Sequence, residues 1–117
     1  MTHTRIRRGD IYYVELNNYD ENSQVQKGIR PILIVSNEYA NRSNVICGLA
    51  MTTRFKSMYL PTHILVKKEK SGLPRDSVVL CEQPISFDTY LLRDKVGHLD
   101  AAEMARVAQG LRIQLSL

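Results

Sequence analysis

KGIRPILIVSN, residues 27–37, is the most strongly patterned segment of the chain. Its apolar part, residues 32–35, lies between a glycine-containing stretch and polar residues, which predicts a buried β-strand over residues 32–36. Pro31 cannot donate a hydrogen bond to a sheet ladder, so we expect it at the first residue of that strand. Arg30 is then expected directly before the first residue of a rigid strand. Its planar, permanently charged guanidinium suits phosphate, and a surface salt bridge is the alternative use of the same side chain.

Other short apolar segments predict further strands around this one. They cover residues 10–16, 45–53, 63–66 and 77–83, and the last is expected to end at Pro84. Residues 38–44 predict a polar turn or one helical turn, residues 67–70 a solvated charge run, and residues 88–92 a short helix. We expect Asp100 to cap a terminal amphipathic helix, because Glu103 follows three residues later as in a capping box. The pattern predicts a mainly β (α+β) fold, a small antiparallel barrel of about five strands with short helices.

The expected strand 45–53 has two different faces, because successive side chains alternate. Thr52 shares its face with Ile46, Gly48 and Ala50, which are mostly small. We therefore expect something to approach the backbone of this face closely.

The composition limits the class of protein. The chain has 117 residues and a net charge of +4, which predicts one domain over residues 1–117 and fits an anionic partner. Cys47 and Cys81 lie in apolar runs and are expected to be small buried hydrophobes. The cysteines and histidines show no zinc-ligand spacing, so we expect no metal site. No apolar stretch is long enough to span a membrane, and a cytoplasmic location is the default expectation.

An ordered set of short motifs runs along the chain. The set covers nearly the entire chain and consists of Arg8-Gly9-Asp10-Ile11-Tyr12, Gly28-Ile29-Arg30-Pro31, Met51-Thr52-Thr53, Leu60-Pro61-Thr62-His63, Arg75-Asp76-Ser77-Val78 and Glu82-Gln83-Pro84-Ile85. In this order the motifs resemble the MazF/PemK (Kid) toxins, the mRNA interferases of type II toxin–antitoxin systems.

The resemblance implies a fold, an activity and partners. The fold is a homodimeric SH3-like barrel with a C-terminal helix. The activity is sequence-specific, ribosome-independent cleavage of single-stranded RNA without a metal or other cofactor, which leaves a 2′,3′-cyclic phosphate and a 5′-hydroxyl and inhibits translation and growth. The partners are that RNA and a MazE-like antitoxin whose extended acidic tail covers the RNA groove. A basic groove suits both ligands.

Three residues are the catalytic candidates. Arg30 is expected to hold the charge of the scissile phosphate, since its pKa makes it a poor acid or base. Thr52 corresponds to the family threonine that pairs with this arginine; an ordinary strand threonine is the alternative. Glu82 matches an acidic residue proposed as acid or base in the Kid branch, and an ion pair orienting Arg30 or another cation is equally open.

The segment that precedes Arg30 departs from the family pattern. The usual loop glutamate and the loop histidine of the Kid branch are both missing from residues 17–27. The general base is therefore unassigned, and His63, which begins a strand beside Pro61, is no obvious substitute.

RNA recognition is assigned mainly to residues 17–27 and 54–59. Their amides can read base edges, their aromatic rings can stack on bases, and their cations suit phosphates. The candidates are Asn17, Asn18, Tyr19, Asn22, Gln24, Gln26, Gly28, Thr53, Arg54, Phe55, Lys56, Tyr59 and Gln83.

Two rival functions stay open at this point. One is a non-enzymatic toxin like the CcdB gyrase poisons, which share the fold. The C-terminal residues of this chain, Leu115-Ser116-Leu117, and its retention of Arg30 and Thr52 argue against this function. The other is an RNA-binding barrel that has lost catalysis, which the missing loop glutamate would fit.

Overall fold

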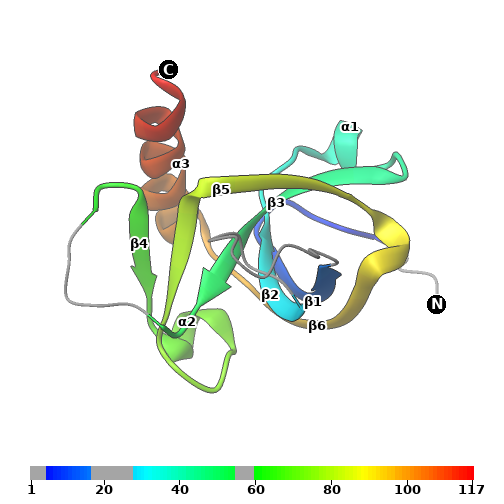
Figure 1. Cartoon of the computed structure of the whole chain (residues 1–117), viewed down its shortest axis with the longest axis horizontal. Helices are drawn as coiled ribbons and strands as arrows, with labels where there is room; N and C mark the ends of the chain where they lie inside the picture. The colour runs from blue at the N-terminus through cyan, green and yellow to red at the C-terminus, as the bar shows by residue number, and fades with distance from the viewer. Residues whose placement is uncertain (1–4, 17–27, 55–59) are drawn as a thin grey trace.

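The computed structural model describes residues 5–16, 28–54 and 60–117. They form one curved antiparallel sheet of six strands, in the order β4-β5-β3-β2-β1-β6, flanked by short helices and by the longer helix α3 (Figure 1). The elements are β1 (Asp10–Leu16), β2 (Gly28–Ile34), α1 (Glu38–Asn41), β3 (Val45–Thr52), β4 (His63–Val66), α2 (Lys68–Ser71), β5 (Ser77–Asp88), the 3₁₀ helix η1 (Thr89–Leu91), β6 (Leu92–His98) and α3 (Ala101–Leu115). No helix in these ranges is long and apolar enough to cross a membrane.

The predicted mainly β fold is confirmed, with differences at particular elements. The chain forms β6 at residues that carry only a weak apolar pattern, and that strand pairs with β1. β4 and β6 are the two edges of the sheet, so its hydrogen-bonded ladder does not close into a barrel. The predicted charge run at 67–70 overlaps the helical turn α2, and the expected helix at 88–92 is the 3₁₀ turn η1. The expected cap of α3 is present, since the Asp100 carboxylate accepts a hydrogen bond from the backbone N–H of Glu103 at 2.9 Å.

Pro84 does not end β5, contrary to the sequence-based expectation. The strand continues to Asp88, and the register with β3 shifts between Leu49 and Met51. Pro84 lies opposite Leu49, next to this irregularity. A bulge tolerates a residue that cannot donate to the ladder, which explains how the proline fits within the strand.

The two faces of the sheet bury separate apolar clusters. One cluster includes Tyr12, Ile32 and Ala50, and the other includes Ile11, Leu33 and other residues that pack with α3. Consecutive residues of β1 and β2 thus alternate between the clusters, as strand geometry requires. The side chains therefore fix the register of the central strands, because a slip of one residue would exchange the two faces.

The small residues of β3 accommodate the core. A Cβ atom at Gly48 would lie 2.4 Å from Ile32 Cγ2 and 3.3 Å from Phe87 Cε1. The expected close approach to this face is thus made by buried side chains of β2 and β5.

Helix α3 meets the sheet at Gly110. A Cβ atom at this position would lie 2.7 Å from the Sγ atom of Cys81 and 3.3 Å from Ile64 Cδ1. Cys81 is fully buried, and its burial, with a smaller effect of the Glu82 charge, raises its pKa to about 11. It is therefore a neutral packing residue, as the sequence predicted, whereas Cys47 is half-buried. The glycine that weakens the helix locally lets it lie close to β5.

We expect Gly110→Ala to destabilise the protein by about 1–3 kcal/mol, the usual range for overpacking a core. At an unhindered helix position the same change would stabilise by roughly 0.5–1 kcal/mol. The free energy of unfolding in urea measures the difference. In a double-mutant cycle with Cys81→Ala, the two changes should couple favourably, because the second removes the sulfur that the new methyl group meets. An increase in the free energy of unfolding on Gly110→Ala would contradict the close packing of Gly110 against Cys81.

Candidate active site

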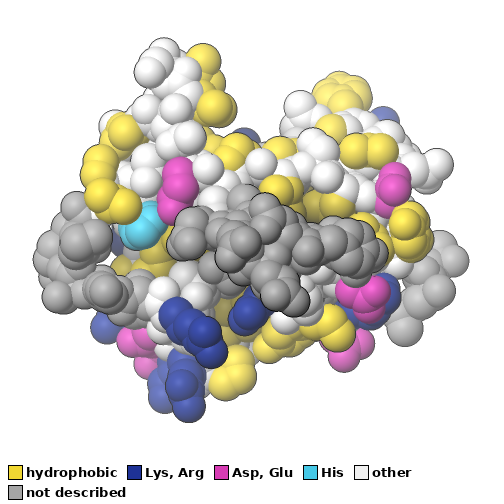
Figure 2. All heavy atoms as spheres, in the orientation of Figure 1, with side chains coloured by type: hydrophobic (Ala, Val, Ile, Leu, Met, Phe, Trp, Pro, Cys, Tyr) yellow, Lys and Arg dark blue, Asp and Glu magenta, His cyan; other side chains and the backbone are white. Residues whose placement is uncertain are grey.

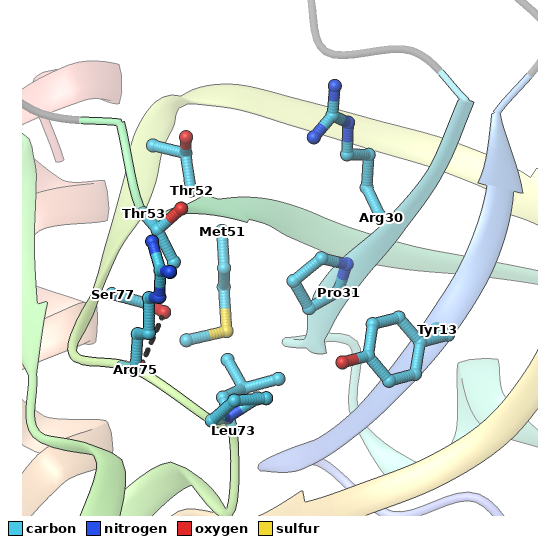
Figure 3. A pocket seen from close by; sticks show the side chains of 10 residues that line it. Tyr13, Arg30, Pro31, Met51, Thr52, Thr53, Leu73, Arg75 and Ser77 are labelled. Carbon is cyan, nitrogen blue, oxygen red and sulfur yellow. Dashed lines mark hydrogen bonds between the residues drawn. The ribbon is translucent and has the colours of Figure 1, made fainter.

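A pocket of about 250 Å³ opens where β2 and β3 separate. The β2–β3 ladder pairs Ile32–Ile34 with Gly48–Ala50 and goes no further, whereas β2 continues along β1 to Gly28. Pro31 lies at the point where β2 leaves β3 and has no N–H to extend that ladder. The pocket is lined by Tyr13, Arg30, Pro31, Met51, Thr52, Thr53, Leu73, Pro74, Arg75 and Ser77 (Figure 3).

Arg30 lies inside β2 and not before it. The strand begins at Gly28, so Arg30 is its third residue and pairs with Val14 of β1. The expected strand start at Pro31 is therefore wrong, because β1 alone extends β2 toward the N-terminus. The backbone of Arg30 is therefore held in place by its pairing with β1.

Thr52 lines the same pocket from β3. It lies opposite Val78 of β5 and is only 9% exposed. Its Oγ1 atom accepts a hydrogen bond from the backbone N–H of Arg54 at 3.0 Å. This contact orients the hydroxyl group and leaves its proton available to an acceptor in the pocket.

The pocket has a polar rim and an apolar floor. Figure 3 shows Arg30 on one wall and Thr52, Thr53 and Arg75 on the other, with Pro31 and Met51 between them. Apolar floors and a few convergent polar groups are common in ligand sites. The arrangement can hold an anionic group at the rim.

Glu82 does not line this pocket. It follows Val78 and Leu80 at alternating positions of β5, and its Oε2 atom lies 2.8 Å from His63 Nε2. Its Oε1 atom is buried and makes no hydrogen bond in the described parts of the chain. The observed contact is thus to an imidazole on the neighbouring strand β4, which is an ion pair when His63 is protonated.

The structure places four of the predicted RNA-binding residues. Thr53 is exposed and lines the pocket, and Arg54 is exposed beside it. Gly28 is exposed at the start of β2 with a left-handed φ of 82°, and Gln83 is half-buried on β5. The other candidates lie outside the described residues: Asn17, Asn18, Tyr19, Asn22, Gln24, Gln26, Phe55, Lys56 and Tyr59.

The sequence interpretation missed three polar residues of the pocket. Tyr13, Arg75 and Ser77 come from β1, from the turn after α2 and from β5. Arg75 and Ser77 belong to a motif that carries the family resemblance, which was the available signal. Tyr13 is half-buried between the buried residues Tyr12 and Val14 of β1, and nothing in the sequence around it indicates a site.

The two charged residues that line the pocket, Arg30 and Arg75, are both basic. Lys and Arg groups gather at the α2 end of the face shown in Figure 2. The described ranges contain no cluster of three His, Cys, Asp or Glu side chains that could hold a metal ion. The local field therefore favours an anionic ligand.

Comparisons with known proteins place the chain among toxins. A family model described as "PemK-like, MazF-like toxin of type II toxin-antitoxin system" matches residues 7–115. The chain belongs to this family. It is 36% identical over 113 residues to "Endoribonuclease EndoA" of Bacillus subtilis (strain 168), a match that covers 96% of each chain.

Solved structures show the same fold. MazF (Form-I) from Deinococcus radiodurans matches with a TM-score of 0.78 and 20% identity, covering 98% of this chain and 100% of that one. An endoribonuclease in complex with its cognate antitoxin, from a mycobacterial species, matches with a TM-score of 0.75 and 24% identity over 96% of each chain.

Proposed function

We propose that this chain is a sequence-specific endoribonuclease toxin that cleaves single-stranded mRNA and so inhibits translation and growth. The observation that carries the proposal is that Arg30 and Thr52 line one pocket on a basic surface. Membership of the toxin family and the 36% identity to an endoribonuclease support it.

The RNA supplies the nucleophile of the proposed reaction. The 2′-oxygen attacks the adjacent phosphorus, and the bond from phosphorus to the 5′-oxygen breaks. The 2′-hydroxyl gives its proton to a base, and the departing 5′-oxygen takes one up. The products are a 2′,3′-cyclic phosphate and a 5′-hydroxyl.

Arg30 and Thr52 stabilise the charge that this reaction builds on the phosphate. The guanidinium of Arg30 can form two parallel hydrogen bonds to non-bridging oxygens. The Thr52 hydroxyl already accepts a hydrogen bond from Arg54 N–H, so it is oriented to donate its proton to a phosphate oxygen. Hydrogen-bond donors that already have the correct orientation in the free enzyme stabilise the transition state, because no side chain has to be reoriented during the reaction.

Glu82 is the candidate for proton transfer. It lies on the Val78–Leu80 face of β5, and Thr52 pairs with Val78 on the adjacent strand. One carboxylate oxygen contacts His63, and the other is buried without a partner in the described residues. Glu82 lies outside the pocket lining, so its role in proton transfer requires that the RNA extend from the pocket along this face of β5 to the exposed part of the side chain, which the contact with His63 orients. The alternative role, an ion pair with His63 alone, requires no substrate contact.

We also propose partners and a cellular location for this chain. The chain acts as a single domain in a homodimer in the cytoplasm. Its partners are single-stranded RNA and a MazE-like antitoxin with an extended acidic tail. The basic surface beside the pocket suits both of these anionic ligands.

Incubation of the purified protein with mixed-sequence RNA tests the function. We expect discrete cleavage with 5′-hydroxyl ends, and the same rate in the presence of EDTA, because the proposed donors are Arg30 and Thr52. Sequencing of the 5′-hydroxyl ends identifies the cleavage site. Binding of RNA without cleavage would favour the degenerate barrel, and inhibition of gyrase without any effect on RNA would favour the CcdB-like toxin.

A further inference from the structure

Arg75 is a second arginine of the pocket, and the proposed cleavage does not use it. It lies between α2 and β5, and in Figure 3 its side chain runs along the Thr53 wall, across the pocket from Arg30. Its side chain is exposed, so the guanidinium is accessible to a ligand.

The backbone around Arg75 is held on both sides. Ser77 is fully buried, and its hydroxyl donates to the carbonyl oxygen of Arg75 at 3.1 Å. The Ser71 hydroxyl accepts a hydrogen bond from Leu73 N–H at 3.0 Å. Gly72 has a left-handed φ of 81°, and a Cβ atom there would lie 2.7 Å from the Val96 carbonyl oxygen. The turn that carries Arg75 is therefore fixed against β6.

The acidic residue next to Arg75 is engaged elsewhere. The carboxylate of Asp76 accepts hydrogen bonds from Lys68 N–H at 2.9 Å and from Lys67 Nζ at 3.4 Å. The backbone hydrogen bond from Lys68 is the main cause that lowers the pKa of Asp76. Within the described ranges, no carboxylate pairs with Arg75, whereas Arg5, Arg93 and Arg106 each have an acidic partner.

We infer that Arg75 binds the RNA phosphate adjacent to the scissile one, so that the pocket holds two consecutive phosphates. This inference rests on the proposed function. Arg30 holds the scissile phosphate on one wall, and Arg75 holds its neighbour on the other. The floor between them, Pro31 and Met51 with Leu73, is apolar, as linings of ligand sites commonly are, and it lies where the nucleoside that joins two phosphates would sit. Arg75 is thus a substrate-positioning residue that touches RNA away from the reacting atoms.

The test uses the full-length protein and a short RNA that contains the cleavage site found for the wild type. A single 2′-deoxy substitution at that site keeps the RNA intact for binding measurements. Arg75→Gln is compared with Arg42→Gln, which removes the same charge from an exposed arginine that packs on Tyr39 outside the pocket. Arg75→Lys separates charge from the two-pronged geometry of the guanidinium.

We expect Arg75→Gln to weaken RNA binding by about 10- to 100-fold, the loss of one charge-assisted hydrogen-bonding group. The slope of log affinity against log salt concentration should become shallower by about 0.7, the value for one phosphate of a single strand. On cleavable RNA, KM should rise while kcat changes little. Arg75→Lys should keep the slope and bind with intermediate affinity, and Arg42→Gln should behave as the wild type.

Equal affinities and slopes for Arg75→Gln and Arg42→Gln would overturn the inference. Weaker binding with an unchanged slope would also overturn it, because the lost contact would then not be to a phosphate. A fall in kcat at unchanged KM would instead assign Arg75 to the reacting phosphate. If the wild type neither binds nor cleaves the RNA, the proposed function itself fails, and the wild-type measurement alone shows that.

Discussion

Arg30→Ala is expected to slow RNA cleavage by about 10²–10³-fold, the usual effect of removing a donor that stabilises transition-state charge. The physical reason is that the scissile phosphate gains negative charge on its non-bridging oxygens, and Arg30 is the cation on the β2 wall of the pocket. The rate constant for a single turnover with excess enzyme measures this effect separately from RNA binding.

Two further variants show whether charge or geometry matters at this position. Arg30→Lys keeps the charge and loses the planar pair of donors, so its rate should lie between those of the wild type and Arg30→Ala. Arg42→Ala removes an arginine outside the pocket and should cleave at the wild-type rate. A rate for Arg30→Ala close to that of the wild type, in a folded protein, would remove Arg30 from the reaction.

Asp10→Ala is expected to give the largest loss of stability, about 3 kcal/mol. The Asp10 side chain is fully buried, and its carboxylate contacts two cations, Lys95 Nζ at 3.2 Å and Arg7 Nε at 3.8 Å, and the imidazole Nδ1 of His98 at 2.8 Å. It also accepts a hydrogen bond from Arg7 N–H at 2.8 Å, which fixes the turn at Gly9 before β1. Removal of one partner from a buried ion cluster typically costs roughly 3–5 kcal/mol, and the lower value applies because the three side chains around Asp10 are partly exposed.

Urea unfolding of two aspartate variants measures this contribution. Asp94→Asn changes an exposed acidic residue of β6 and should shift stability by less than about 0.5 kcal/mol. Asp10→Asn keeps the size of the side chain and loses the charge, so its cost should lie between those of Asp94→Asn and Asp10→Ala. Equal stabilities for Asp10→Ala and Asp94→Asn would show that the cluster contributes nothing.

The parts of the fold that could be predicted from sequence are those where local pattern and burial agree. The span of β1 is as expected because the β-forming residues Ile11, Tyr12, Tyr13 and Val14 follow one another just after Gly9 and Asp10. The capped start of α3 is as expected because Asp100 and Glu103 have the spacing of a capping box. In both cases neighbouring residues determine the element.

β6 could not be predicted because its residues depend on a partner far away in the sequence. Five of its seven residues are polar or glycine, and only Leu92 is fully buried. The strand exists because it pairs with β1, and Lys95 and His98 bind the Asp10 carboxylate. Such long-range pairing leaves little mark on local periodicity.

In the candidate site, too, some residues could be predicted from local sequence and others depend on how distant segments fold together. Arg30 and Thr52 could be predicted from motifs and strand alternation, and they line one pocket. Arg75 could not be assigned a place, because its position depends on how the turn after α2 folds back toward β3. The His63–Glu82 pair likewise depends on the register of β4 with β5.

The ends of the cleaved RNA test the central claim, that the pocket of Arg30 and Thr52 promotes attack by the 2′-hydroxyl. The measurement is the mass of the products from two RNAs that contain the wild-type cleavage site and differ by one 2′-deoxy substitution at the scissile nucleotide. We predict a 2′,3′-cyclic phosphate and a 5′-hydroxyl from the unmodified RNA, and no cleavage of the deoxy RNA. Cleavage of the deoxy RNA, or products with a 5′-phosphate, would contradict the account.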